Sequence, residues 1–363
     1  MNVLSDARTE INEIDREMLK LFEKRMKCSE AIAAYKKENA LSVKDEERER
    51  ELIEKNRALV ENNEIEGYYV DFLKKIFELS CEYQSKLIKG IRVGYSGVEG
   101  AFSHIAAKKL FPEGELMAFG SFRDAYSSVE RGETDCVVLP IENSFAGDVG
   151  TVMDLMFSGS LFINQVTGVD VVQNLLGVRG ASLDSVKTVV SHSQALDQCV
   201  DYISDHGLQT VTYSNTALAA KYVRDKNDPS VAAIASLETA EIFGLSVLER
   251  NINTSSSNTT RFAVFSRSHN KPLISGKHDN ERFILVYTVE NEAGALAQTL
   301  NIIGAHGFNM ISLQSRPMKE LMWTYYFFVE AEGNIHSENG RDMLKELSVL
   351  CAKLKLVGSY LDN

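Results

Sequence analysis

Two positively charged residues fall on the apolar face of a long helix predicted near the N-terminus. Arg25 and Lys36 lie, at about 100° per residue, inside the stripe that apolar side chains form along that helix. The stripe comprises Ile11, Ile14, Met18, Leu21, Phe22 and Ile32. A single such cation is usually a side chain whose long stem snorkels out of the core. Two cations on one stripe weaken that interpretation.

Two further predicted helices carry polar groups that could lie beside these cations. Asp45, Arg48 and Glu49 share one face of the second helix through i+3 and i+4 spacing, for which surface ion pairs are the alternative interpretation. The third helix has an apolar stripe that continues into polar residues: Leu73, Ile76, Phe77, Ser80 and Gln84. If the helices run antiparallel, these polar groups meet the cations. We therefore expect a polar pocket inside an all-α three-helix bundle.

In this pattern the segment resembles the all-helical chorismate mutases. The matching positions are Ala7-Arg8, Ile14-Asp15, Arg25, Lys36, the run VKDEERE from Val43 to Glu49, Ser80 and Gln84. The resemblance implies that Arg25, Arg48 and Arg8 of a second copy hold the two carboxylates of chorismate. It also implies that Lys36 and Gln84 bind the ether oxygen, while Asp45, Glu49 and Ser80 line the pocket. A pericyclic rearrangement needs a clamped conformer and fixed donors, and neither a nucleophile nor a metal.

The middle of the chain places small polar residues at the ends of predicted strands. These segments are LPIENSFAGDVG (139–150), SHSQALDQC (191–199), NTALAA (215–220), AAIASLETAEIFGL (232–245) and NTTRF (258–262). Each alone is most simply a capped turn. The glycines of GYSGVEG could accept an anion at a helix start, but no acidic residue follows at the spacing of a dinucleotide fold, which argues against NAD.

Together and in this order, the segments resemble prephenate dehydratases over 91–267. The resemblance implies an α/β two-lobed fold similar to type II periplasmic binding proteins, with prephenate in the cleft between the lobes and no metal or cofactor. The implied cleft residues are Asn143, Ser191, Gln198, Thr260 and Arg261, with Ser103, Glu142, Ser144 and Thr216 nearby.

The reaction expels the ring hydroxyl together with carbon dioxide, so the cleft needs a proton donor and groups that hold two carboxylates. We assign Thr260 as the donor to the leaving hydroxyl, and Glu142 is the competing candidate. Arg261 either neutralises a carboxylate or structures the lobe, and the sequence favours neither.

The C-terminal part has the order strand, helix, strand, strand, helix, strand, which is an α+β ferredoxin-like (βαββαβ) unit. We predict its second helix over 340–354 and a short last strand over 355–360. Gly294, Ala295 and Leu296 open the first helix, and Gln314, Ser315, Arg316 and Pro317 end a strand. These runs could be only a helix start and a turn. After a dehydratase segment they resemble ACT domains, which implies an L-phenylalanine site at a domain dimer interface, with Gln314 in place of the usual Glu.

The elements that position these residues form three modules. We predict a mutase domain over 1–90, a dehydratase domain over 91–268, a linker over 269–281 and an ACT domain over 282–363. The first helix runs unbroken to about Asn39, or roughly 50 Å at 1.5 Å per residue. That is too long for two shorter helices to cover, so we expect it to pack against a second copy in a homodimer or homotetramer.

Composition limits the partners of the chain of 363 residues. Its net charge of -12 argues against nucleic acid, because phosphate binding needs a surplus of Lys and Arg. Its five cysteines are scattered and without metal-ligand spacing, so we expect no metal site and a reducing compartment. The N-terminal residues have no signal-peptide pattern, and no apolar run approaches the roughly 20 residues that span a bilayer. We expect a cytoplasmic protein with no membrane partner.

Two other functions remain open from the sequence. A binding-protein-like fold with an ACT domain could be a non-catalytic phenylalanine sensor, although Arg25, Lys36, Arg48 and Gln84 would then have no purpose. The cleft sequence also admits an arogenate dehydratase.

Overall fold

The computed structural model describes residues 3–38, 45–255, 258–269, 280–318 and 325–362. The chain divides into two compact units, 1–92 and 93–363, which we treat separately. Most of the predicted linker lies outside the described residues, as do Val43 and Lys44 of the mutase-like run. No helix of the described chain is long and apolar enough to cross a membrane.

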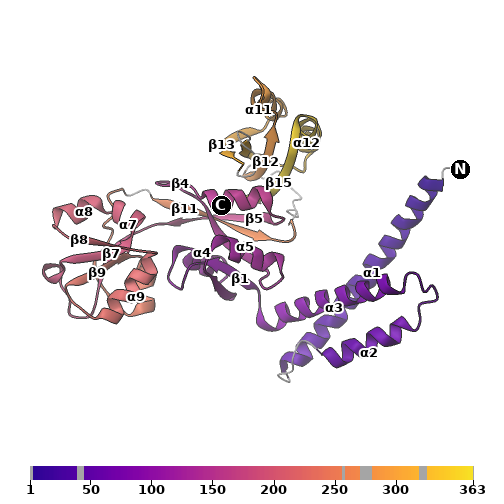
Figure 1. The fold of residues 1–363 in the computed structure, drawn as a ribbon, viewed down its shortest axis with the longest axis horizontal. Coiled ribbons are helices and arrows are strands. Elements are labelled where there is room, and N and C mark those ends of the chain that lie inside the picture. Colours follow the sequence, from indigo (N-terminus) through magenta and orange to yellow (C-terminus); the bar gives the residue numbers. More distant parts are fainter. Residues whose placement is uncertain (1–2, 39–44, 256–257, 270–279, 319–324, 363) are drawn as a thin grey trace. The chain divides into compact units, whose positions relative to one another are not determined.

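Over its described residues the first unit folds into three helices, as predicted (Figure 1). They are α1 (Val3–Glu38), α2 (Glu46–Arg57) and α3 (Glu66–Lys89), and both α1 and α2 pack against α3. Asp45 begins α2 as its N-cap, because its carboxylate accepts a hydrogen bond of 3.0 Å from the backbone N–H of Arg48.

The apolar stripe of α1 stays largely uncovered within one chain. Ile14 is 50% exposed and Leu21 is 67% exposed, whereas on α1 only Ser29 and Ala33 are buried among the described side chains. The two shorter helices therefore cover only part of α1, as its length requires. A surface of this kind is costly in water and is typical of a helix that packs against a partner.

The second unit begins with a lobe built on a mixed sheet. Its strands are β1 (Arg92–Ser96), β2 (Glu115–Phe119), β3 (Cys136–Asn143), β4 (Gly147–Asp148), β5 (Phe162–Asp170) and β11 (Thr259–Ser266). The strand order is β5-β11-β3-β1-β2, with β4 paired to β3. Its helices are α4 (Phe102–Leu110), α5 (Phe122–Glu130) and α6 (Gly150–Ser158).

A second lobe lies between β5 and β11 in the sequence. Its strands are β6 (Asn174–Gly177), β7 (Thr188–His192), β8 (Gln209–Tyr213), β9 (Val231–Ala235) and β10 (Ser246–Glu249), in the order β10-β6-β9-β7-β8. Its helices are η1 (Leu183–Ser185), α7 (Ser193–Asp197), α8 (Val200–Asp205), α9 (Thr216–Lys226) and α10 (Leu237–Phe243). The chain thus crosses between the lobes twice, which confirms the predicted two-lobed α/β architecture.

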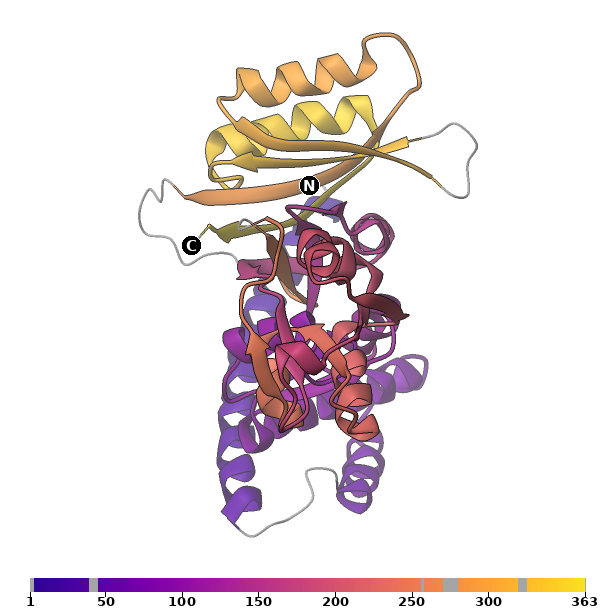
Figure 2. The same ribbon diagram turned by 90° about the vertical axis from the view of Figure 1, so that its left-hand side faces the viewer.

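The C-terminal module has the predicted βαββαβ order. It comprises β12 (Glu281–Val289), α11 (Ala295–Ala305), β13 (Asn309–Pro317), β14 (Tyr325–Glu332), α12 (Glu338–Leu350) and β15 (Cys351–Leu361), and its strand order is β13-β14-β12-β15. Both helices lie on one face of this sheet (Figure 2).

The predicted end of α12 at Leu354 was wrong, and so was the short last strand. β15 begins at Cys351 because its first residues pair with β12, where Cys351 lies opposite Val289. β15 then reaches β5 of the first lobe, so that one sheet joins the dehydratase and C-terminal modules. At this junction a Cβ on Gly358 would overlap the carbonyl oxygen of Ile163, so only glycine fits.

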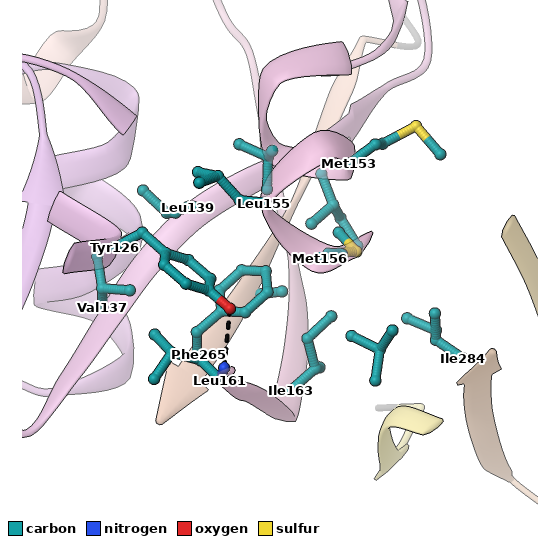
Figure 3. Packing of buried hydrophobic residues seen from close by; sticks show 14 of the residues in the cluster. Tyr126, Val137, Leu139, Met153, Leu155, Met156, Leu161, Ile163, Phe265 and Ile284 are labelled. Atoms are coloured by element: carbon teal, nitrogen blue, oxygen red, sulfur yellow. Dashed lines mark hydrogen bonds between the residues drawn. The ribbon is translucent and has the colours of Figure 1, made fainter. Parts of the chain in front are cut away.

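The core of the first lobe extends to the C-terminal module. Tyr126, Leu139, Met156 and Phe265 pack together and meet Ile284 of β12 (Figure 3). The Tyr126 hydroxyl accepts a 2.8 Å hydrogen bond from the backbone N–H of Leu161, and burial raises the pKa of that hydroxyl well above its usual value. The two modules therefore share one hydrophobic core.

Candidate active sites

The first unit brings Arg25 of α1 to the polar end of α3. The Arg25 guanidinium donates to Ser80 Oγ and, at 3.5 Å, to the carbonyl oxygen of Ile76, and it lies 5.6 Å from the centre of the Phe77 ring. Burial lowers the pKa of Arg25. Arg25 therefore does not snorkel freely into water, as expected for a cation held on a buried helix face.

Gln84 carries an unused hydrogen-bonding group in the same unit. Its side chain is 6% exposed, and its Oε1 atom has no partner among the described residues. Lys36 is half-buried. Leaving a buried polar atom unpaired costs free energy, so such atoms usually mark a bound ligand or water. Glu49 lines a neighbouring cavity of about 470 Å³ and accepts a 3.5 Å contact from Cys81 Sγ.

Other predicted mutase residues are not brought into contact with Arg25 by one chain. Arg8 is exposed on α1. The Arg48 side chain is 63% exposed and lies 3.5 Å from Glu51. Asp45 is exposed as well and caps α2, the helix that carries Arg48 and Glu49. This pattern is that of an incomplete pocket, whose other two predicted arginines, Arg8 and Arg48, lie on exposed helix faces.

A cleft of about 370 Å³ opens between the two lobes of the second unit, and Asn143 and Thr260 lie in its wall. Asn143 Oδ1 accepts from the backbone N–H groups of Phe145 and Ala146 at 3.1 and 2.8 Å, which fixes the orientation of its amide. Asn143 Nδ2 then donates 2.8 Å to Thr260 Oγ1. Because Thr260 accepts this bond, its own hydroxyl proton is available to a ligand in the cleft.

The second lobe contributes Gln198 and Thr216 to the same cleft, and Ser103 comes from the first lobe. Gln198 Oε1 accepts a 3.1 Å hydrogen bond from Gln173 Nε2. Ser191 was expected in the cleft, but it is fully buried behind it and its hydroxyl donates 2.6 Å to the carbonyl oxygen of Ile234. Ser191 therefore supports β7 rather than facing the cavity.

No Asp, Glu, Lys or Arg lines the cleft among the described residues. Helix N-termini face it instead. The first turn of α4 contributes Phe102 and Ser103, and Asn215 caps α9 by accepting 2.7 Å from the N–H of Leu218. Free N–H groups and the helix dipole favour a carboxylate at such positions.

Arg261 and Glu142, which we expected in the cleft, lie on the opposite face of the sheet. Both neighbour cleft residues, but side chains alternate along a strand, so Thr260 and Asn143 face the cleft while Arg261 and Glu142 face away. Ser144 is exposed and bonds the backbone of Thr259 instead of lining the cavity. The resemblance located the motif, but not the face of each residue.

The sequence analysis missed Gln173 and His192 as cleft residues. Gln173 is 1% exposed, lines the cleft, and keeps Oε1 without a partner in the described part of the chain. Its position in the apolar run VDVVQNLLG was a usable signal, because an uncharged amide inside such a run must find a partner or bind a ligand. His192 stood within the quoted segment SHSQALDQC.

In the C-terminal module, Gly294 caps α11 with a φ of 88°, a left-handed conformation that favours glycine, and Ala295 and Leu296 begin the helix. Gln314 Nε2 donates 2.5 Å to Asp148 Oδ1 of β4, and its buried Oε1 has no described partner. Burial raises the pKa of Asp148.

The rest of the predicted regulatory run lies at the end of β13. Arg316 Nε donates 3.3 Å to Asp154 of α6, while Ser315 and Pro317 face outward along this edge strand. Gln314 and Arg316 therefore connect the predicted phenylalanine site to the dehydratase module.

Comparison with known proteins agrees with the three modules. Family models match for chorismate mutase type II at 7–85, prephenate dehydratase at 93–270 and the ACT domain at 283–348. A bifunctional chorismate mutase/prephenate dehydratase of Aquifex aeolicus is 32% identical over 99% of this chain and 98% of its own length.

Two solved structures resemble the second unit. Prephenate dehydratase of Arthrobacter aurescens, in complex with L-Phe, has a TM-score of 0.69 at 26% identity and covers 75% of this chain and 90% of its own. GqqA, described as a novel type of quorum quenching acylase, has a TM-score of 0.68 at 28% identity and covers 75% and 98%. Since relatives of near-equal length match all three modules in order, the chain belongs to the family of bifunctional chorismate mutase/prephenate dehydratases.

Proposed function

We propose that the first unit converts chorismate to prephenate, and that the cleft of the second unit converts prephenate to phenylpyruvate under inhibition by L-phenylalanine. The observation that carries the proposal is the fixed hydrogen bond from Asn143 to Thr260, which leaves the Thr260 hydroxyl proton available to a ligand in a cleft with helix N-termini.

In the mutase site, Arg25 and Arg48 hold the carboxylates of chorismate, and Arg8 of a second copy completes the clamp. Lys36 and Gln84 stabilise the charge that develops on the ether oxygen, while Asp45, Glu49 and Ser80 line the pocket. Support comes from the half-buried Arg25 and the unpaired Oε1 of Gln84. It also comes from the exposed stripe of α1, which fits a homodimer or a tetramer built from such dimers.

In the dehydratase site, Thr260 donates its hydrogen bond to the departing ring hydroxyl. The ring carboxylate leaves as carbon dioxide, its C–C electron pair completes the aromatic ring, and the C–O bond breaks to release hydroxide, which takes up a proton from solvent to form water. Gln198 and Thr216 orient the substrate, while the N-termini of α4 and α9 hold its carboxylates. Asn143 positions Thr260. Aromatisation drives this step.

The cleft favours prephenate over arogenate. Arogenate carries an ammonium group where prephenate has a keto group, and an ammonium in a partly buried site requires a carboxylate partner. Asp and Glu are absent from the cleft wall over the described residues, and helix N-termini repel a cation. Turnover on each substrate separates the two: we expect kcat/KM for prephenate to exceed that for arogenate by at least about tenfold.

The regulatory site is formed by Gly294, Ala295 and Leu296 of α11 with Gln314, Ser315, Arg316 and Pro317 of β13. The Arthrobacter aurescens relative is in complex with L-Phe, which supports the same effector here. For the modules we propose the boundaries 1–90, 91–268 and 282–363. We also propose a cytoplasmic location, because none of the five cysteines, all within the described residues, forms a disulfide.

Two variants test both reactions in one assay. Supplied with chorismate, Thr260→Ala should accumulate prephenate and form little phenylpyruvate. Arg25→Ala should form no phenylpyruvate from chorismate, yet convert added prephenate at the unmodified rate. Phenylpyruvate formation by Thr260→Ala at the unmodified rate would refute the assignment of the donor.

A further inference from the structure

An ion cluster lies directly behind the cleft, at the contact between the dehydratase and C-terminal modules. The Arg261 guanidinium forms two parallel bonds to Glu330, with NH2 to Oε1 at 2.6 Å and NH1 to Oε2 at 2.9 Å. It also donates 2.8 Å to the Tyr360 hydroxyl and 3.0 Å to Glu142. Tyr360 in turn donates to Glu330. Arg261, Glu330 and Tyr360 thus bond to one another in a closed ring, and Glu142 joins it through Arg261.

The C-terminal module supplies the buried members of this cluster. Glu330 belongs to β14 and is 1% exposed, and Tyr360 belongs to β15 and is 2% exposed. Arg282, 3.9 Å from Glu330, is the other cation that faces this carboxylate. A buried carboxylate without its cation is strongly unfavourable, and a bidentate pair tolerates little change in geometry. The position of Glu330 therefore sets the position of Arg261.

Arg261 is coupled to the proposed proton donor through two residue pairs of the sheet. Thr260 lies opposite Asn143 and Arg261 lies opposite Glu142 on β11 and β3. The first pair faces the cleft, and the second faces the ion cluster. A shift of Arg261 along or across β11 therefore shifts Thr260 relative to Asn143.

The backbone ladder is irregular at this point. Arg261 pairs with Glu142 but Phe262 pairs with Pro140, so one residue of β3 is bulged out beside Arg261. Pro140 also has no N–H to donate to β11. On its other side β11 keeps a regular ladder with β5 from Thr259 to Val264, so the irregularity lies only on the side of Asn143 and Glu142. On that side, side-chain contacts have more influence on how β11 and β3 lie against each other.

We propose that Arg261 is a positioning residue whose contacts with Glu330 and Tyr360 hold Thr260 against Asn143, so that the seating of the C-terminal module controls the dehydratase cleft. This inference rests on the proposed function. It also gives phenylalanine a route to the cleft. Gln314 and Arg316 contact Asp148 and Asp154, and β13, which carries them, pairs with β14, which carries Glu330. A ligand that moves β13 thereby moves Glu330.

The test compares kcat and KM for prephenate in the full chain and in Glu330→Gln, Arg261→Lys and the double variant. We expect kcat to fall about tenfold or more in each single variant while KM changes less than about threefold, because the Thr260 hydrogen bond strengthens in the transition state. The fall in kcat of the double variant should not exceed that of the less active single variant, because both changes break the same contact. In Glu330→Gln, saturating phenylalanine should no longer lower the rate, although calorimetry still detects its binding.

Lys355→Gln is the matched control. Lys355 lies on β15, as Tyr360 does, and it also joins the two modules. Its Nζ donates 2.8 Å to the carbonyl oxygen of Met156 on α6 and 2.5 Å to that of Gly159 just after α6. No described contact links Lys355 to β11. Its kcat should stay within about twofold of the unmodified chain. Tyr360→Phe, which removes only one hydroxyl, serves if Glu330→Gln does not fold. It should lower kcat without raising KM.

Chorismate mutase activity of each preparation reports on the unchanged first unit. An unchanged kcat in folded Glu330→Gln or Tyr360→Phe would overturn the inference, as would an equal loss in Lys355→Gln or additive losses in the double variant. Failure of the unmodified chain to form phenylpyruvate from prephenate would instead refute the proposed function.

Discussion

Thr260 and Arg261 are consecutive on β11 and face opposite sides of its sheet. Thr260 accepts a hydrogen bond from Asn143 in the cleft, whereas Arg261 binds Glu330 of the C-terminal module. This pair of neighbours joins the chemistry of one module to the structure of another. Its contacts support our proposal that Arg261 has a structural role rather than binding a carboxylate, a choice that the sequence left open.

Thr260→Ala should lower dehydratase kcat about 100-fold or more, because it removes the hydrogen bond to the leaving hydroxyl. Glu142→Gln should keep kcat within about fivefold, since Glu142 faces away from the cleft and Arg261 keeps its two bonds to Glu330. Steady-state phenylpyruvate formation from prephenate measures both. If Glu142→Gln proves the more damaging change, Glu142 is the proton donor.

Hydrophobic patterning predicted the element order, and the resemblance to prephenate dehydratases implied the cleft pair Asn143 and Thr260, because patterning and motif position are local properties. It misplaced Arg261 and Glu142, because the motif was carried over without the alternation that turns neighbours of Thr260 and Asn143 to the other face. The partners that Arg261 meets on that face come from residues about 70 to 100 positions later, which the local pattern does not show. The end of α12 was wrong for a similar reason. Helix propensity alone continues through Cys351, and only pairing with β12 converts this segment to strand.

Mixing two inactive variants tests whether Arg8 acts in the mutase site of a second copy. Arg8→Ala and Arg48→Ala should each lower mutase activity about 100-fold or more, because each loses one carboxylate clamp. When the two chains are unfolded and refolded together, mixed dimers regain one intact site, and about a quarter of the unmodified activity should return.

The complementation also has a clear negative result. No recovery in mixed dimers, isolated by a different affinity tag on each variant, would place Arg8 and Arg48 in the same chain's pocket. Arg16→Ala mixed with Arg48→Ala is the control, because Arg16 lies on α1 outside the mutase-like pattern and its variant should be active alone.

The pair Arg261–Glu330 should make stability depend on pH in the acid range. Burial opposes the charge of Glu330, but the hydrogen bonds and charge of Arg261 outweigh it and hold the pKa of Glu330 below its usual value. As the pH falls, Glu330 is therefore protonated in the unfolded chain before it is protonated in the native chain, at a pH near its usual pKa of about 4.3. The stabilisation that the Arg261–Glu330 pair contributes is complete above that pH. It is lost as the pH falls from there through the pKa of Glu330 in the native chain.

Urea unfolding of the second unit between pH 3 and pH 7 checks this expectation. At neutral pH, Glu330→Gln should lose about 3 kcal/mol, because it removes one partner of a buried pair. The difference between the two proteins should shrink below about pH 4. A difference that stays constant over the whole range would show that the charge of Glu330 does not contribute.

Gln314→Glu should weaken the contact between β13 and β4. The new carboxylate would lie against Asp148, whose pKa burial already raises, and each would oppose ionisation of the other. We expect a loss of about 1 kcal/mol at pH 8 that diminishes at pH 5 as one carboxyl becomes protonated. Thermal unfolding at both values measures it, and equal losses at both would contradict the contact with Asp148.

The central claim is that both catalytic sites and the sensor operate in this one chain, and the most direct test is phenylpyruvate formation from chorismate alone, with and without L-phenylalanine. We predict that the purified chain forms phenylpyruvate from chorismate and that added phenylalanine lowers the rate. Absence of phenylpyruvate, with phenylalanine still bound, would contradict the account and favour a non-catalytic phenylalanine sensor.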